Sequence, residues 1–94
     1  EELPVRYYNP LDKKYHRYFP DFVVKTVNND KYMIEIKPSR QAVKPKPPKK
    51  KTKSYMRESF EYIKNQAKWS AAKSYCDDNG MQFKLITEKD LGKY

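Results

Sequence analysis

The order of segments over residues 32–86 limits the folds open to this chain more than any other pattern in it. Residues 32–37 and residues 81–86 both alternate in side chains that favour strands. Between them, apolar side chains recur at spacings of three and four, which predicts a helix whose core-facing stripe is Met56, Phe60, Ile63, Ala67 and Ala71. Because a helix that joins two strands of one sheet makes a crossover, we expect these strands to be parallel.

Both ends of this helix carry sequence signals. Ser54 is the expected N-cap, because its hydroxyl can accept a hydrogen bond from a backbone N–H of the first turn. The helix should stop near residues 77–79, since Gly80 suits the left-handed conformation of a C-terminal cap. A second apolar stripe, for which we expect core burial, contains Trp69, Ala72 and Cys76.

The first third of the chain predicts the remaining strands. Residues 5–8 and 15–27 are rich in strand formers, and a turn composition separates them at residues 9–12. Pro20 should mark a kink in the second arm, because proline has no N–H to donate to a ladder. The chain therefore reads as β-β-β-α-β, an α/β (α+β) fold with a mixed four-stranded sheet and a crossover helix, in a single domain over residues 1–94.

The chain is strongly basic. Its 21 Lys and Arg against 12 Asp and Glu give a net charge of +9, which favours an anionic partner such as nucleic acid. We expect residues 38–53 to form an extended Pro/Lys-rich loop whose candidate DNA-binding side chains are Lys44, Lys46, Lys49, Lys50, Lys51 and Lys53. No apolar run approaches the roughly 20 residues that cross a bilayer, so we expect no membrane partner. The lone Cys76 and lone His16 exclude a disulfide framework and a Cys/His zinc site.

Two carboxylates are the strongest candidates for chemistry. Asp21 and Glu35 fall on strands that we expect to be neighbours, and like charges brought together require a cation to neutralise them. Their oxygens, together with the backbone carbonyl of Ile36, form a hard donor set that suits Mg²⁺, with Mn²⁺ as an alternative. Lys37 shares a strand face with Glu35 and could activate a water or stabilise charge on a phosphoryl transition state. The pattern predicts phosphodiester hydrolysis with Asp21, Glu35 and Lys37 as catalytic residues.

These residues also carry a family resemblance. Pro20-Asp21, thirteen intervening residues and Glu35-Ile36-Lys37 resemble the signature of the PD-(D/E)XK, or restriction-endonuclease-like, nuclease superfamily. The core order of that superfamily is helix, three strands, helix, strand. The resemblance implies that the first core helix, which often carries a further acid, is absent because the chain is truncated at its N-terminus.

A closer resemblance covers most of the chain. Four segments look like the head-completion nucleases of T-even bacteriophages and, more distantly, the N-terminal nuclease domain of TnsA transposition endonucleases: residues 7–12, 16–22, 35–38 and 65–69. It implies a magnesium-dependent endonuclease that acts on DNA during phage head completion, in the host cytoplasm or on the virion, with head or portal proteins as partners. Many members of the superfamily work as dimers, so the resemblance leaves open a homodimer by analogy. The TnsA resemblance places Gln66 and Lys68 near the pocket or the DNA backbone.

Each assignment has a simpler alternative. Glu35 and Lys37 could form a same-face ion pair on a solvated strand, with Asp21 as a turn residue. The lysine run could be a solvated loop, and Gln66 and Lys68 could be surface residues. A DNA-binding or structural head-assembly protein could use the same fold without turnover. We assign His16 a structural role, and we assign the tyrosines of the strands, Tyr18 among them, to sheet packing rather than to stacking on bases.

Overall fold

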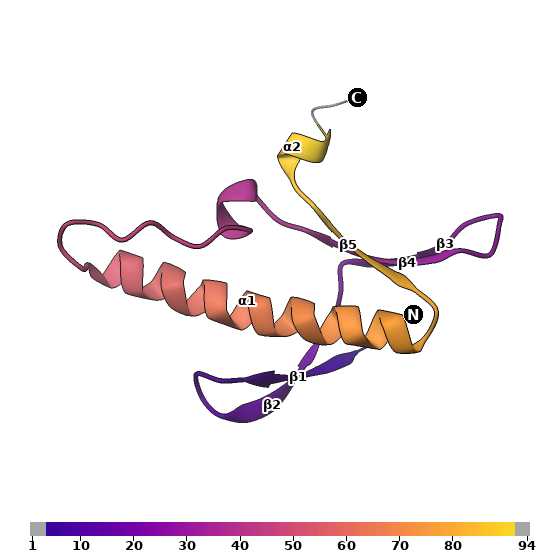
Figure 1. The fold of residues 1–94 in the computed structure, drawn as a ribbon, viewed down its shortest axis with the longest axis horizontal. Coiled ribbons are helices and arrows are strands. Elements are labelled where there is room, and N and C mark those ends of the chain that lie inside the picture. The colour runs from indigo at the N-terminus through magenta and orange to yellow at the C-terminus, as the bar shows by residue number, and fades with distance from the viewer. Residues whose placement is uncertain (1–3, 92–94) are drawn as a thin grey trace.

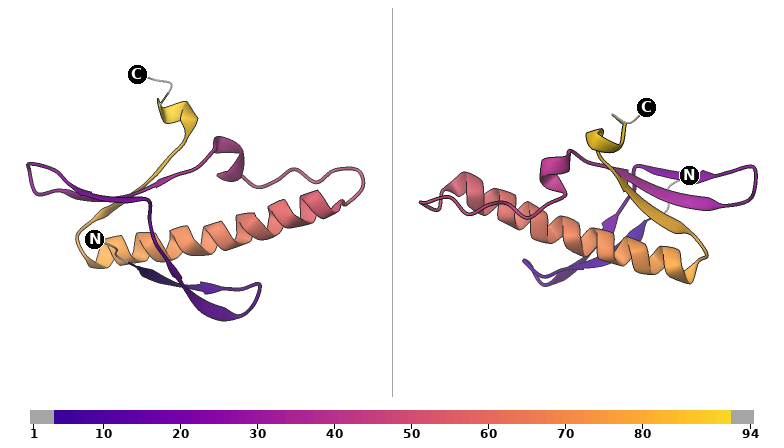
Figure 2. Two further views of the ribbon diagram at one scale, coloured as in Figure 1. Left: turned by 180° about the vertical axis from the view of Figure 1, so that it is seen from behind. Right: turned by 45° about the horizontal axis from the view of Figure 1, so that its top comes forward.

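A computed structural model describes residues 4–91, which form two small β-sheets on either side of one long helix (Figures 1 and 2). The first sheet is an antiparallel hairpin of β1 (Val5–Asn9) and β2 (Lys14–Tyr18). The second has the order β3-β4-β5, where β3 is antiparallel and β5 parallel to β4; its strands are Phe22–Lys25, Lys31–Ile36 and Gln82–Ile86. The α+β class and the parallel crossover pair are therefore confirmed, and they are compatible with a restriction-endonuclease-like fold.

The helices occupy the connections after β4 and β5. The crossover helix α1 (Lys53–Asp78) packs chiefly against β1 and also against β5. A 3-10 helix, η1 (Ser39–Gln41), follows β4, and a short helix, α2 (Glu88–Leu91), follows β5. In the described part of the chain, no helix is long and apolar enough to cross a membrane.

The predicted four-stranded sheet is wrong in one respect. The second arm that we expected over residues 15–27 is divided into β2 and β3, which belong to different sheets. The break falls at residues 19–21, around Pro20. Because proline offers no N–H to a neighbouring strand, the ladder of the hairpin ends there and the chain turns into the second sheet. The described residues therefore contain five strands in two sheets.

Local turn and cap chemistry explains the element boundaries. Asn29 and Gly80 have positive φ angles of 69° and 67°, and they end the β3–β4 turn and α1 in the left-handed conformation that such residues tolerate. The N-cap of α1 is Thr52, two residues before the predicted Ser54; its Oγ1 accepts a hydrogen bond of 3.1 Å from the N–H of Tyr55. Thr52 has the extended backbone that an N-cap needs, whereas Ser54 already lies inside the helix.

One core joins both sheets to α1. Its buried apolar members come from β1, β2, β4, α1 and the residue before β5, and they are Val5, Tyr7, Tyr18, Met33, Trp69, Ala72, Cys76 and Met81. The predicted burial of the stripe with Trp69, Ala72 and Cys76 is confirmed.

The other predicted stripe is wrong over its first half. Met56, Phe60 and Ile63 are 42%, 47% and 38% exposed, while Ala67 and Ala71 pack against the edge of the core. The cause is length. A helix of 26 residues is about 39 Å long at roughly 1.5 Å per residue, so its first half extends past strands of only 4–6 residues. Figure 1 shows this half of α1 running beside the loop over residues 42–52.

Candidate active site

Glu35 is a buried carboxylate at the junction of the two sheets. The pleat of β4 turns Met33 and Glu35 toward α1, and the side chains are 0% and 5% exposed. Glu35 pairs with Leu85 of β5 in the parallel register. A charged group at this depth requires compensating partners, because transfer of an isolated carboxylate out of water is costly. The strand is therefore not the solvated one that a simple surface ion pair would need.

Asp21 lies one residue before β3, in the break between the two sheets rather than on a strand as predicted, and its side chain approaches the same end of β4. The antiparallel register pairs Phe22 with Ile34, and one further step along it brings Asp21 opposite Glu35. The Oδ2 of Asp21 accepts a hydrogen bond of 2.8 Å from the backbone N–H of Ile36. Since the N–H and C=O of one strand residue point toward the same edge, the carbonyl of Ile36 also faces the Asp21 side.

Lys37 supplies the positive charge next to Glu35. Its backbone N–H donates to the carbonyl of Ile86 at 3.0 Å, which continues the β4–β5 pairing by one residue. This bond holds the backbone from which the Lys37 side chain extends. Its Nζ lies 3.5 Å from Oε2 of Glu35. The structure therefore brings the three residues Asp21, Glu35 and Lys37 together at one end of β4.

Tyr18 completes the surroundings of Glu35 from the other sheet. Its hydroxyl donates a hydrogen bond of 2.6 Å to Oε1 of Glu35. Burial raises the pKa of the Tyr18 hydroxyl, and the hydrogen bond to Glu35 raises it further, so this group stays protonated and donates. Sequence reasoning did not assign Tyr18 to the site, because a contact between residues 18 and 35 leaves no local pattern.

Lys68 borders this cluster from α1, whereas Gln66 does not. The Nζ of Lys68 lies 5.9 Å from the ring centroid of Tyr7 and 5.8 Å from that of Tyr18. Burial lowers the pKa of the Lys68 ammonium, and the charges of Lys64 and Lys37 lower it further, while Glu35 opposes them. Gln66 is exposed.

The donor set at this site fits a hard divalent cation. Asp21 and Glu35 contribute carboxylate oxygens and Ile36 a carbonyl, which are the ligands that Mg²⁺ prefers. The cluster contains no soft ligand, since the one cysteine, Cys76, is buried in the core against Met33. Within residues 4–91, no group of three or more His, Cys, Asp or Glu side chains is placed to hold a metal. A cation at this site would have the two carboxylates and the Ile36 carbonyl as protein ligands, with water and substrate oxygens completing its shell.

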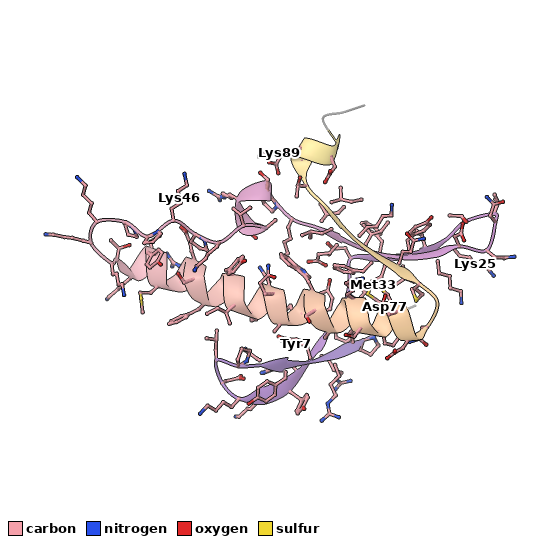
Figure 3. The ribbon with its side chains drawn as sticks, in the orientation of Figure 1. Tyr7, Lys25, Met33, Lys46, Asp77 and Lys89 are labelled. Carbon is pink, nitrogen blue, oxygen red and sulfur yellow. The ribbon has the colours of Figure 1, made fainter. Side chains whose placement is uncertain are left out.

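The loop lysines lie away from this cluster. All six lysines predicted to contact DNA are exposed: Lys44, Lys46, Lys49, Lys50, Lys51 and Lys53. Figure 3 shows Lys46 beside the first half of α1, while Met33 lies over the second half. Lys53 is the first residue of α1 rather than the last of the loop.

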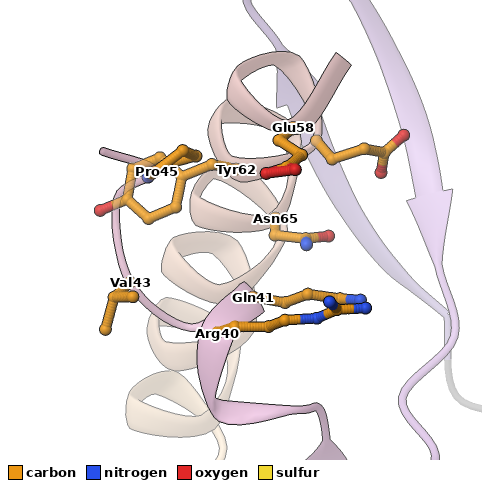
Figure 4. Close-up of a pocket in the computed structure, with 8 residues that line it drawn as sticks. Arg40, Gln41, Val43, Pro45, Glu58, Tyr62 and Asn65 are labelled. Carbon is orange, nitrogen blue, oxygen red and sulfur yellow. The ribbon is translucent and has the colours of Figure 1, made fainter. Parts of the chain in front are cut away.

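Between the loop and α1 is a cavity of about 190 Å³ (Figure 4). Its polar lining includes Arg40 and Gln41 of η1 and the buried Asn65 of α1. The lining comes from η1, the loop after it and the first half of α1, and it includes no residue of β4.

His16 takes a structural role, as its sequence context predicted. Its Nε2 lies 2.7 Å from Oδ2 of Asp12, across the β1–β2 turn. The other oxygen of Asp12 accepts from the N–H of Lys14 at 3.1 Å. The hydrogen-bond partner of His16 therefore belongs to the hairpin, and no hydrogen bond or ion pair joins His16 to Asp21 or Glu35 among the described residues.

Comparisons with known proteins agree with this architecture. The model of the TnsA-like endonuclease N-terminal family matches residues 1–88. The head completion nuclease of enterobacteria phage T4 is 32% identical over 95 residues, which cover 97% of this chain and 63% of that relative. The chain thus spans less than two thirds of the relative's length. A comparison with solved structures found no match. Since the family match covers nearly all of the sequence, the chain belongs to the TnsA-like endonuclease N-terminal family.

Proposed function

We propose that this protein is a Mg²⁺-dependent DNA endonuclease whose centre is formed by Asp21, Glu35 and Lys37. One observation carries the proposal: two carboxylates and one ammonium meet at the end of β4, where Asp21 is held on the Ile36 amide and Lys37 lies 3.5 Å from Glu35. The family to which the chain belongs supports endonuclease activity, and the net charge of +9 supports DNA as the substrate.

Different residues would bind the cation, activate the water and bind DNA during phosphodiester hydrolysis. Asp21, Glu35 and the Ile36 carbonyl hold the cation, and Mn²⁺ can replace Mg²⁺ in the same oxygen set. When bound, the cation supplies Lewis acidity toward the scissile phosphate. Lys37 orients the attacking water or offsets the charge that develops on the phosphoryl oxygens. Lys68 and the loop lysines bind the phosphate backbone, whose recognition needs charge rather than base contacts.

The similarity to the T4 head completion nuclease supports a proposal for the biological setting. The protein would process DNA while phage heads are completed in the host cytoplasm, with head or portal proteins as partners, and it could stay with the virion or act as a homodimer. Sedimentation of the protein together with DNA-filled heads, but not with empty ones, would support this setting. Its absence from every head fraction would contradict a lasting association with the virion.

The catalytic proposal is tested by cleavage of supercoiled plasmid with Mg²⁺, with Mn²⁺ and with a chelator. We expect nicking by the wild type with either metal, none with the chelator, and losses on the order of 10² to 10³-fold for Asp21→Asn and Lys37→Met. Lys31→Met is the matched control, because Lys31 is exposed at the opposite end of β4. Equal nicking by all four proteins, or DNA binding without nicking by any of them, would show that the centre is misassigned.

A further inference from the structure

The two oxygens of Glu35 have different partners. Oε1 accepts the hydroxyl of Tyr18 at 2.6 Å, and Oε2 lies 3.5 Å from Nζ of Lys37. Tyr18 ends β2 in the hairpin, while Glu35 lies in the second sheet, so this hydrogen bond spans the junction between the sheets.

Packing alone does not require the Tyr18 hydroxyl. The side chain is 4% exposed and belongs to the core, where a phenylalanine ring would occupy nearly the same volume. A buried hydroxyl without a hydrogen-bond partner destabilises the fold. Here the hydroxyl donates to a carboxylate, and this charge-assisted hydrogen bond offsets the loss of its contacts with water. Tyr7 is a useful contrast: it is 5% exposed and also lies beneath Lys68, but within residues 4–91 it makes no hydrogen bond to either carboxylate.

We infer that Tyr18 is a positioning residue for the metal centre: it fixes the carboxylate plane of Glu35 through Oε1 and leaves Oε2 to face the cation shared with Asp21. A glutamate side chain has three rotatable bonds. A hydrogen bond at one carboxylate oxygen restricts their rotation, so the second oxygen is held in one position. Tyr18 in turn is held by its core neighbours and by the hairpin register with Val5. The inference rests on the function proposed above.

Two effects of the hydroxyl oppose each other. Donation to Oε1 withdraws charge from the carboxylate and weakens its attraction for a cation, whereas fixed orientation strengthens binding. Outer hydrogen bonds to metal-ligating carboxylates have a favourable net effect, and their removal lowers metal affinity by about 10 to 100-fold. We therefore expect the orienting effect to prevail.

The test measures Mn²⁺ binding by calorimetry and by the electron paramagnetic resonance signal of free Mn²⁺, so it does not depend on activity. We expect Tyr18→Phe to weaken Mn²⁺ binding by about tenfold. Tyr7→Phe, the matched control beneath the same lysine, should bind as the wild type does. A protein with 3-fluorotyrosine incorporated at Tyr18 keeps the donor and should also retain wild-type affinity, and it reports on the hydroxyl even if Tyr18→Phe fails to fold.

The outcomes separate this inference from the proposed function. Equal Mn²⁺ affinity in the wild type and in folded Tyr18→Phe, beside a clear loss in Glu35→Gln, would overturn the role of Tyr18 and leave the metal centre intact. Loss of Mn²⁺ binding in the fluorotyrosine protein would overturn it as well. Failure of the wild type to bind Mn²⁺, or binding unaffected by Glu35→Gln, would remove both proposals together.

Discussion

The carboxylate of Asp21 is bound to the backbone of the strand that carries Glu35, through a hydrogen bond of 2.8 Å from the Ile36 N–H. This contact occurs where the β3–β4 ladder has just ended, so the side chain of Asp21 takes the place of the next backbone partner. The hydrogen bond at Oδ2 thereby orients the Asp21 carboxylate, and Oδ1 is the oxygen that could bind a ligand. The exposed Asp21, just before β3, and the buried Glu35 of β4 thus lie near the same end of β4.

Lys68 should matter for cleavage although it lies on α1. Lys68→Met keeps an unbranched side chain above the rings of Tyr7 and Tyr18 but removes the charge, and we expect the cleavage rate to fall roughly tenfold, as for loss of one charge-assisted contact.

Lys73→Met is the control, since Lys73 is exposed on the same helix and pairs with Asp77. Gln66→Ala should also be silent. Plasmid nicking at fixed Mg²⁺ measures all three, and an equal effect of Lys68→Met and Lys73→Met would remove Lys68 from the site.

The loop lysines should set the salt dependence of DNA binding rather than the chemistry. Replacing Lys49, Lys50 and Lys51 together by alanine should weaken binding to every DNA sequence alike. The slope of log affinity against log salt is negative, and each lost phosphate contact reduces its magnitude by about 0.9, so the triple change should reduce the magnitude by up to roughly 2.7. A control that replaces Lys13, Lys25 and Lys31, which lie in the hairpin and β3–β4 region, has the same charge loss away from the loop. Fluorescence titrations at several salt concentrations would refute the loop's role if both triple variants changed the slope equally.

Two methionines should differ strongly in their contribution to stability. Met33 is 0% exposed between the sheet and α1, so Met33→Ala should lower the free energy of unfolding by about 2–5 kcal/mol. Met56 is 42% exposed on the first half of α1, so Met56→Ala should change it by less than about 1 kcal/mol. Urea denaturation followed by circular dichroism measures both. Similar losses for the two variants would mean that the predicted stripe with Met56 is a core face after all.

The contact between Glu88 and Ser39 should depend on pH. The Glu88 carboxylate accepts hydrogen bonds from the hydroxyl and the backbone N–H of Ser39, and these two bonds lower its pKa below the ordinary value for glutamate. A lowered folded-state pKa means that the contact is fully present above the ordinary pKa of about 4.3 and is lost as the pH falls through the lower folded value. The amide proton shift of Ser39 should therefore titrate with a midpoint below that ordinary value. In Glu88→Gln this titration should disappear, and its persistence would mean that another group causes it.

Local patterns in the sequence were sufficient for the elements whose signals are short-range. The alternation of residues 32–37 correctly placed Glu35 and Lys37 on one face of the strand, and Gly80 marked the end of α1. The strand, helix, strand order correctly predicted a parallel pair, because a crossover connection leaves few alternatives.

Features that depend on distant partners could not be predicted in this way. Periodicity identified two apolar stripes on α1 but could not tell which one faces a sheet, since that depends on where the short strands end along a longer helix. Pro20 was expected to kink one strand, and only the arrangement of both sheets shows that it separates two. The hydrogen bond from Tyr18 to Glu35 joins different sheets, so no spacing rule reveals it.

Anomalous diffraction from crystals of the protein grown with Mn²⁺ would show directly whether Asp21 and Glu35 share one divalent cation. We expect one anomalous peak within coordination distance of a carboxylate oxygen from each of Asp21 and Glu35 and of the Ile36 carbonyl, and no such peak for Asp21→Asn. A Mn²⁺ peak bound elsewhere, or no peak at this end of β4 under conditions in which the protein cleaves DNA, would contradict a shared cation.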